Sequence, residues 1–352
     1  MPTTRQWLLD AHPRGRPAEA GDFRLVTRET GSPAEGEMLL ATRYLGFDPA
    51  QKGWMENIAD YVAPMAIGDV MRGSAVSEVL ESRHPGFVPG DLVVGTTGWT
   101  ELHLSDGTGI EKVSTSLSPT AMLSILGTTG LTAWCGLFKL GRPLPGDTVL
   151  VSGAAGATGS VVGQLARIAG ARTVGIAGGA EKCRWLVEEA GFDVAIDYRA
   201  NDLADQIAAQ CPHGANVVFD NVGGVVLDAM LGSLATGARV VLCGGISRNQ
   251  TGGLPQGPAN YFNLVFRRAS MAGFIVLDWA DEFPAIRGRL ERLVQFGRLT
   301  YREDIQDGFE NAPATLMRLF AGQNRGKQLL RLQAPAHQAV TPPSTQSSAP
   351  VT

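Results

Sequence analysis

The sequence predicts a two-domain α/β fold, with a doubly wound parallel sheet in one domain and a mostly β module in the other. From Asp147 to about Phe296, short β-branched runs alternate with longer helical patterns. This alternation is typical of a parallel sheet covered by helices on both faces. Residues 1 to about 120 instead contain many short extended runs separated by turns such as Gly31-Ser-Pro33 and Pro85-Gly86.

The parallel sheet is expected to contain six strands with helices between them. After the first strand, Val161, Val162, Leu165 and Ile168 recur at the spacing of one helix face, so this helix should cover the sheet. The six strands are expected at residues 148–151, 172–176, 193–196, 216–219, 238–242 and 269–276.

The domain limits follow from where these patterns change. The sheet pattern stops near Tyr301, and a further extended run from Gln328 to Leu332 suggests that the chain returns to the first module. We therefore expect one domain at 1–125 and 300–333 and the other at 126–299. Residues 334–352 are rich in Pro, Ser, Thr, Gln and Ala and are expected to form a disordered tail, because so few apolar groups cannot offset the entropy of ordering.

Composition narrows the choice of partner. The 352 residues are 44% hydrophobic and 18% charged, with a formal net charge of -4. This acidic balance leaves no basic stripe for nucleic acid or an anionic membrane. No run approaches the roughly 20 apolar residues that span a bilayer, so a cytoplasmic protein with a small-molecule ligand is expected.

A glycine-rich turn is the strongest motif. Gly153, Gly156 and Gly159 directly follow an expected strand and open an apolar-faced helix, which is the context of a dinucleotide site. The first glycine permits the turn, the second lets the backbone approach a pyrophosphate, and the third allows close packing of helix on strand. Free N–H groups at the start of the helix would meet the anion. The alternative is a βα turn without a ligand.

The next strand indicates which dinucleotide binds. Sites that prefer NAD usually carry an acidic residue at the end of the second strand, for the ribose 2′-hydroxyl. Here that position is Gly178, and Lys182 follows one turn into the next helix. Two glycines would leave room for a 2′-phosphate and Lys182 could pair with it, so NADP is favoured. Glu181 is an adjacent acidic group, and Lys182 could also be an ordinary surface lysine.

Several stretches resemble the zinc-free medium-chain dehydrogenases/reductases. Within them, the chain is similar to the branch of leukotriene/prostaglandin reductases, alkenal double-bond reductases and curcumin reductases, from Trp7 to Leu332. The stretches that carry the resemblance are Gly153–Trp185, Phe219–Gly224, Cys243–Ser247, Leu45–Pro49, Val70–Gly73, Gly127–Ala133, Arg302–Asp304, Glu310–Pro313 and Gly322–Lys327.

The resemblance implies a GroES-like catalytic domain joined to a Rossmann domain, NADPH in the cleft between them, and a homodimer. Residues that match Lys182, Tyr198 and Asn324 contact the adenosine or its phosphates in such relatives, and those that match Asn221, Cys243 and Ile246 lie along the cofactor. The full set expected to bind NADPH is Thr129, Gly156, Ala157, Thr158, Gly159, Gly178, Lys182, Tyr198, Asn221, Cys243, Ile246, Phe274 and Asn324.

The family reaction is the reduction of a carbon–carbon double bond conjugated to a carbonyl. Hydride moves to the β-carbon, and the negative charge that reaches the carbonyl oxygen needs hydrogen-bond donors. Many relatives place tyrosines where this chain has Ala50 and Asn249. Tyr61 is therefore our first candidate for a pocket hydroxyl and Tyr261 the second. Each could instead be a packed ring, and the ribose hydroxyl with a water could serve without any side chain.

The expected substrate pocket contains Ala50, Trp54, Tyr61, Trp99 and Asn249. Where relatives carry a basic pair after Asp-Pro, this chain has Lys52 and Trp54. These replacements suggest a pocket shaped for a bulkier or more apolar enone than short alkenals.

Three other functions compete with enone reduction. A zinc alcohol dehydrogenase on this scaffold needs converging Cys and His ligands, but no cysteine precedes Cys135 and the four cysteines show no CxxC spacing. We therefore expect free thiols and no metal. A zinc-free quinone reductase would share the cofactor site, and a non-catalytic NADPH-binding module would share it as well.

Overall fold

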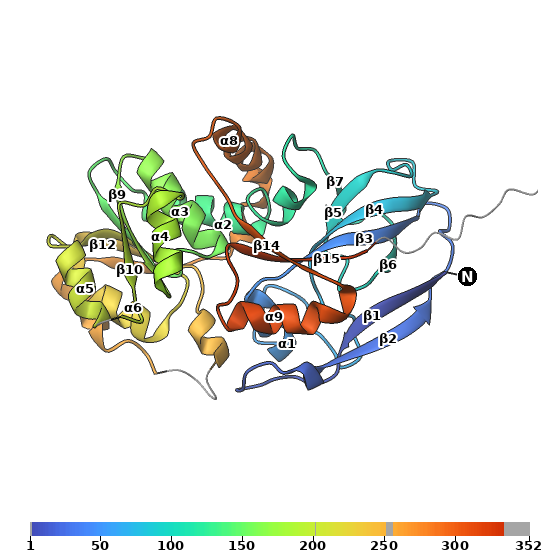
Figure 1. The fold of residues 1–352 in the computed structure, drawn as a ribbon, viewed down its shortest axis with the longest axis horizontal. Coiled ribbons are helices and arrows are strands. Elements are labelled where there is room, and N and C mark those ends of the chain that lie inside the picture. The colour runs from blue at the N-terminus through green and yellow to red at the C-terminus, as the bar shows by residue number, and fades with distance from the viewer. Residues whose placement is uncertain (1, 201, 251–255, 334–352) are drawn as a thin grey trace, which may run out of the picture.

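The structure is a computed structural model that describes residues 2–200, 202–250 and 256–333. The tail expected at 334–352 and the side chain of Asn249 lie outside the described residues. Figure 1 shows the parallel-sheet domain beside the mostly β domain, with β14 and β15 running across the middle of the molecule.

The parallel sheet has six strands in the described chain, in the order β10-β9-β8-β11-β12-β13, and all five ladders are parallel. This is the order of a Rossmann fold. The predicted fold class is confirmed, and each strand lies within a few residues of its expected position. The strands are β8 (Thr148–Val151), β9 (Arg172–Ala177), β10 (Val194–Asp197), β11 (Ala215–Asp220), β12 (Leu234–Leu242) and β13 (Ser270–Gly273).

Helices cover both faces of this sheet because alternate strand residues point to opposite sides. Val149 and Val151 pack in one cluster with α3, whereas Leu150 packs in another with α5 and α6. The predicted apolar face of α3 is buried against the sheet. The helices of this domain are α2 (Thr128–Cys135), α3 (Ala157–Ile168), α4 (Ala180–Glu188), α5 (Leu203–Gln210), α6 (Gly224–Leu231), α7 (Asn263–Phe266) and α8 (Phe283–Gln295).

The mostly β domain is completed by the returning chain. β15 pairs antiparallel with β3, so the extended run expected near residue 328 is a strand of the first domain's sheet. The sheet order is β14-β15-β3-β4-β5-β7, with β6 on β3, and β1 pairs with β2 separately. The strands are β1 (Thr3–Leu9), β2 (Phe23–Glu29), β3 (Met38–Gly46), β4 (Ala75–Ser82), β5 (Leu92–Gly95), β6 (Leu102–Ser105), β7 (Glu111–Lys112), β14 (Glu303–Asp307) and β15 (Lys327–Arg331).

Two helices, α1 (Ala50–Glu56) and α9 (Ala312–Phe320), pack together in the core of this domain, with Met55 and Leu316 in one apolar cluster (Figure 1). Short helical turns connect the larger elements. They are η1 (Ala20–Asp22), η2 (Pro119–Leu123), η3 (Gly136–Gly141), η4 (Ile246–Gln250), η5 (Ala259–Phe262), η6 (Val276–Glu282) and η7 (Phe309–Asn311).

Candidate functional site

The glycine turn connects β8 to α3 with the geometry of an anion site. Gly156 is the N-cap of α3, and the first turn of this helix contains no acidic residue. A side chain at Gly159 would collide with the carbonyl oxygen of Gly153, so only glycine lets α3 start this close to the strand. The N–H groups at the start of α3 have no acceptor within the helix, and a pyrophosphate beside this turn could accept hydrogen bonds from them.

A buried carboxylate holds the neighbouring strand end in place. Asp220 accepts hydrogen bonds from Ser152 Oγ at 2.6 Å and from Gly223 N–H at 2.9 Å. Asn221 in turn donates its side-chain amide to the carbonyl of Ser152 at 2.7 Å. Burial raises the pKa of Asp220. Asn221 was predicted from the sequence, whereas Asp220 and Ser152, which position it, were not.

The space beside Gly178 is not empty, contrary to the sequence argument. A side chain here would approach Tyr198 Cε1 at 2.9 Å and Arg199 Nε at 3.0 Å, so these two side chains occupy the room that the sequence argument gave to a phosphate. No acidic side chain is present at this position, because Tyr198 and Arg199 approach the backbone of Gly178 too closely for a side chain. Arg199, which the sequence analysis did not select, therefore lies at the predicted 2′-phosphate position.

Lys182 lies in a group of cations rather than on an open surface. Its ammonium donates to the carbonyl of Gly322 at 2.7 Å. Burial lowers the pKa of Lys182, and the positive charges of Arg199 and Arg325 lower it further. Glu181 pairs with Arg325, one of these cations, at 2.8 Å and lines the same small cavity as Lys182. A phosphate dianion would relieve the repulsion among these cations, so the residues present fit the 2′-phosphate of NADPH.

The loop 322–326 of the β domain closes against the glycine turn. Gly326 forms a backbone bridge with Gly156, and Asn324 Nδ2 donates to the carbonyl of Gly326 at 2.8 Å. Asn324 is buried and shapes this loop. Gly326 has a φ of 78°, and a side chain there would collide with the carbonyl of Arg302.

Four further predicted cofactor residues lie after β12, in α2 and after β13. Cys243 and Ile246 follow β12 and are hydrogen-bonded to Asp220 and Asn221 through their backbone N–H groups. Burial raises the pKa of the Cys243 thiol to about 12. Thr129 lies on the other side of α3, where its hydroxyl donates to the carbonyl of Ser124 at 2.8 Å. Phe274 follows β13, which is paired with β12, and it packs on Trp279 with ring centroids 5.7 Å apart.

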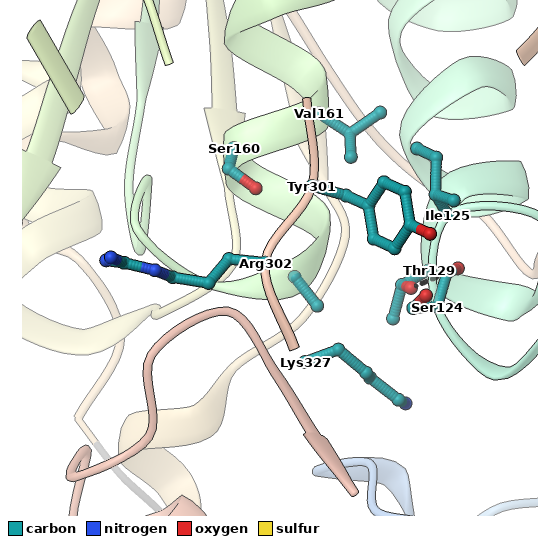
Figure 2. Close-up of a pocket in the computed structure, with 9 residues that line it drawn as sticks. Ser124, Ile125, Thr129, Ser160, Val161, Tyr301, Arg302 and Lys327 are labelled. Atoms are coloured by element: carbon teal, nitrogen blue, oxygen red, sulfur yellow. Dashed lines mark hydrogen bonds between the residues drawn. The ribbon is translucent and has the colours of Figure 1, made fainter. Parts of the chain in front are cut away.

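A small cavity lies between the two domains at the start of α3. It has a volume of about 10 Å³, room for about one water molecule. Figure 2 shows Tyr301, Lys327 and Thr129 around it, and Arg302 points the opposite way from Lys327. Ala157 also lines the cavity. Tyr301 and Lys327 were not predicted from the sequence.

Ala50, Trp54 and Tyr61 lie together on and after α1. Trp54 Nε1 donates to Tyr61 Oη at 3.3 Å, and the Arg72 guanidinium stacks over the Trp54 ring at 5.8 Å. The Tyr61 side chain is 40% exposed. Because its oxygen accepts from Trp54, its own O–H proton is available to a ligand. Ile58, whose N–H donates to the carbonyl of Gly53 in α1, is an exposed apolar side chain next to this helix.

Two expected pocket residues lie elsewhere. Trp99 is completely buried and packs on Phe23 and Phe47, so it fills the core of the β domain instead of forming a pocket wall. Tyr261 is 58% exposed in η5, and Asn260 ties this turn to Asp228 of α6. Among the described residues, the Tyr261 ring contacts Phe262, with centroids 6.2 Å apart, and not the Trp54–Tyr61 pair.

The described residues also bear on the competing functions. Within 2–200, 202–250 and 256–333, no group of three His, Cys, Asp or Glu side chains is placed to hold a metal ion. All four cysteines are free thiols. In the part of the chain that the structure describes, none of the helices has the length and apolar character to cross a membrane.

Comparison with known proteins identifies the family. Residues 5–113 match the family model described as the N-terminal domain of oxidoreductase, and residues 157–292 match the model described as zinc-binding dehydrogenase. The chain is 40% identical over 334 residues to the NADPH-dependent curcumin reductase of Escherichia coli (strain K12), covering 93% of this chain and 96% of that protein. It belongs to the zinc-free medium-chain dehydrogenases/reductases.

Other members of this family are nearly as similar. Prostaglandin reductase 1 of Oryctolagus cuniculus is 37% identical over 335 residues, with 93% of each chain covered. The crystal structure of CurA from Vibrio vulnificus in complex with NADPH has a TM-score of 0.88 and 38% identity, covering 94% of this chain and 100% of that one. The GroES-like domain and Rossmann domain of this family are thus the two domains described above.

Replacing Lys182 by methionine should reduce the preference for NADPH over NADH. The variant loses a charge-assisted contact to the 2′-phosphate, so Kd for NADPH should rise about 10- to 100-fold while Kd for NADH changes less than about threefold. Titrations of the purified variant with each cofactor, followed by protein fluorescence, measure both constants.

Lys139→Met is the matched control, because Lys139 pairs with Glu282 away from the cation group and should leave both constants unchanged. An equal loss of affinity for NADPH and NADH in Lys182→Met would show that Lys182 does not bind the 2′-phosphate.

Proposed function

We propose that this protein uses NADPH to reduce the carbon–carbon double bond of α,β-unsaturated ketones or aldehydes. The observation that carries the proposal is the cation group of Lys182 and Arg199 at the end of β9, beside a glycine turn that opens α3. Full-length similarity to the NADPH-dependent curcumin reductase and to the 2-alkenal reductase of Nicotiana tabacum supports the substrate class.

The reaction needs hydrogen-bond donors and a shaped pocket from the protein. NADPH supplies the hydride that reaches the β-carbon. Negative charge then develops on the carbonyl oxygen of the substrate, where a fixed donor stabilises it most. We assign Tyr61 as this donor, because its oxygen accepts a hydrogen bond from Trp54 and its own O–H can donate to the substrate. Water then protonates the α-carbon, and the enolate returns to the carbonyl form.

The surface beside Tyr61 favours a large apolar substrate. Ala50 provides a small side chain where the family resemblance implies a tyrosine, and the half-buried Trp54 and exposed Ile58 provide apolar side chains on and next to α1. Such a surface gains more from burying a ring than from burying a short chain, since the gain scales with apolar area. We therefore propose a preference for aryl or cyclic enones over short alkenals.

NADPH consumption with three probes tests this function. Benzylideneacetone should be reduced with a higher kcat/KM than crotonaldehyde, and both more efficiently than a simple benzoquinone. In the Tyr61→Phe variant, kcat/KM for benzylideneacetone should fall about 10- to 100-fold, the effect of losing one donor to a developing oxyanion, while Kd for NADPH stays the same. Mass spectrometry of the product should place deuterium from labelled NADPH on the β-carbon.

Each part of the proposal has its own contrary outcome in this assay. A higher efficiency with the quinone would make the protein a quinone reductase. NADPH binding without turnover of any probe would indicate a non-catalytic module. A Tyr61→Phe rate within a few-fold of wild type would remove Tyr61 as donor and leave the role to a cofactor hydroxyl or water.

We also propose that the chain works as a cytoplasmic homodimer. β13 is the last strand in the order of its sheet, and all four of its residues are exposed. Exposed Phe262 and Phe266 lie in the same part of the chain, together with Tyr261. An exposed edge with apolar neighbours favours pairing with a second copy, and a two-fold axis would pair β13 with itself. Free thiols are typical of a reducing compartment.

Light scattering should measure a mass of twice the monomer for the wild type. Met271→Asp should shift the mass to that of the monomer, because it introduces a charge at the centre of the paired edge. Val88→Asp, which alters an exposed apolar residue of the β domain, is the control and should remain dimeric. A monomeric wild type at micromolar concentration would refute the dimer.

A further inference from the structure

Lys327 is a buried cation whose presence the cofactor site alone does not explain. It is the first residue of β15, its side chain is 3% exposed, and its ammonium pairs with the carboxylate of Asp48. Burying an ammonium costs free energy unless it is paired. Asp48 is 24% exposed, so Lys327 is the more deeply buried partner. The two residues are 279 positions apart in the chain.

The backbone at Lys327 is set by the cofactor turn. Its N–H donates to the carbonyl of Arg302 at 2.8 Å, and the preceding residue, Gly326, forms the bridge to Gly156. A side chain at Gly326 would collide with the backbone of Arg302, so the chain just before Lys327 packs closely on that residue. The Lys327 side chain also lines the cavity that Thr129 and Ala157 line (Figure 2). A shift of the backbone at the start of α3 would therefore move the backbone at Lys327.

Asp48, the other residue of the ion pair, precedes α1, the helix that carries part of the proposed substrate pocket. It lies two residues before α1, and its backbone N–H donates to Gln51 Oε1 at 3.0 Å. Gln51 Nε2 donates to the carbonyl of Arg72 at 2.9 Å, and Arg72 stacks on Trp54, which binds Tyr61. A continuous series of polar and ring contacts thus connects the Lys327 ammonium with the proposed hydroxyl donor.

We propose that Lys327 is a positioning residue that couples cofactor binding to the substrate pocket, an inference that rests on the proposed NADPH-dependent enone reduction. A pyrophosphate at the start of α3 brings negative charge to the cavity that Lys327 lines and fixes the loop 322–326 on the glycine turn. Lys327 then holds Asp48, and with it the start of α1, in the arrangement that binds the enone. Substrate affinity therefore depends on the cofactor through this ion pair.

The test measures binding instead of turnover. Benzylacetone, the saturated product of benzylideneacetone, is titrated with and without saturating NADP⁺. The wild type should bind it about 5- to 100-fold more tightly with NADP⁺, the usual range of coupling between two sites. In the paired variant Asp48→Asn/Lys327→Met this ratio should fall to within about twofold of one, while Kd for NADP⁺ changes less than about threefold.

The paired variant removes both charges, so no unpaired charge is left buried and the fold should survive. Asp48→Asn alone is the second variant, since it removes only the partly exposed partner, and it should reduce the same ratio. Lys327→Arg, made in an otherwise wild-type chain, retains the positive charge and should therefore retain part of the coupling.

Arg43→Met/Glu78→Gln is the matched control. This pair joins β3 to β4 at 2.6 Å in the same sheet, and both side chains are partly buried. The control should lower the melting temperature without changing the coupling ratio. A wild-type ratio in both Asp48 variants, or a wild type that reduces enones without any coupling, would overturn the role of Lys327. A wild type that reduces no enone would instead refute the proposed function.

Discussion

The backbone contact between Gly156 and Gly326 is the constraint on which the site depends. It joins the glycine turn of the Rossmann domain to the last loop of the GroES-like domain. Neither domain alone provides the full set of groups around the cofactor position, because Lys182 and Asp220 come from one and Asn324 and Gly326 from the other. The chain returns to its first domain after the parallel sheet, and this return brings the loop 322–326 against the turn.

Charge, more than space, explains the cofactor preference. The position that is acidic in NAD sites is Gly178, but Tyr198 and Arg199 fill the room beside it. Burial lowers the pKa of Lys182, and the nearby positive charges of Arg199 and Arg325 lower it further because like charges repel. A ligand with an additional phosphate supplies negative charge, and the ribose 2′-hydroxyl of NADH does not.

The sequence predicted the parts of the molecule that depend on local patterns. β-Branched runs, the periodic face of α3 and the glycine spacing identified the parallel sheet and the phosphate turn, because each is determined within about ten residues. Arg199 and Lys327 were missed since their roles depend on contacts across the fold. Trp99 was misplaced for the same reason: a tryptophan after a glycine fits a pocket wall or a core, and only its packing on Phe23 and Phe47 decides.

Amide hydrogen exchange with and without NADPH tests the central claim, that the cofactor is held by both domains at this contact. Local opening of a loop becomes rarer when a ligand binds across it, so exchange slows in every segment that the ligand holds. Saturating NADPH should slow exchange in residues 153–159 of the turn and also in residues 322–327 of the other domain. Protection of the turn alone, with residues 322–327 exchanging at their rate in the free protein, would contradict the account.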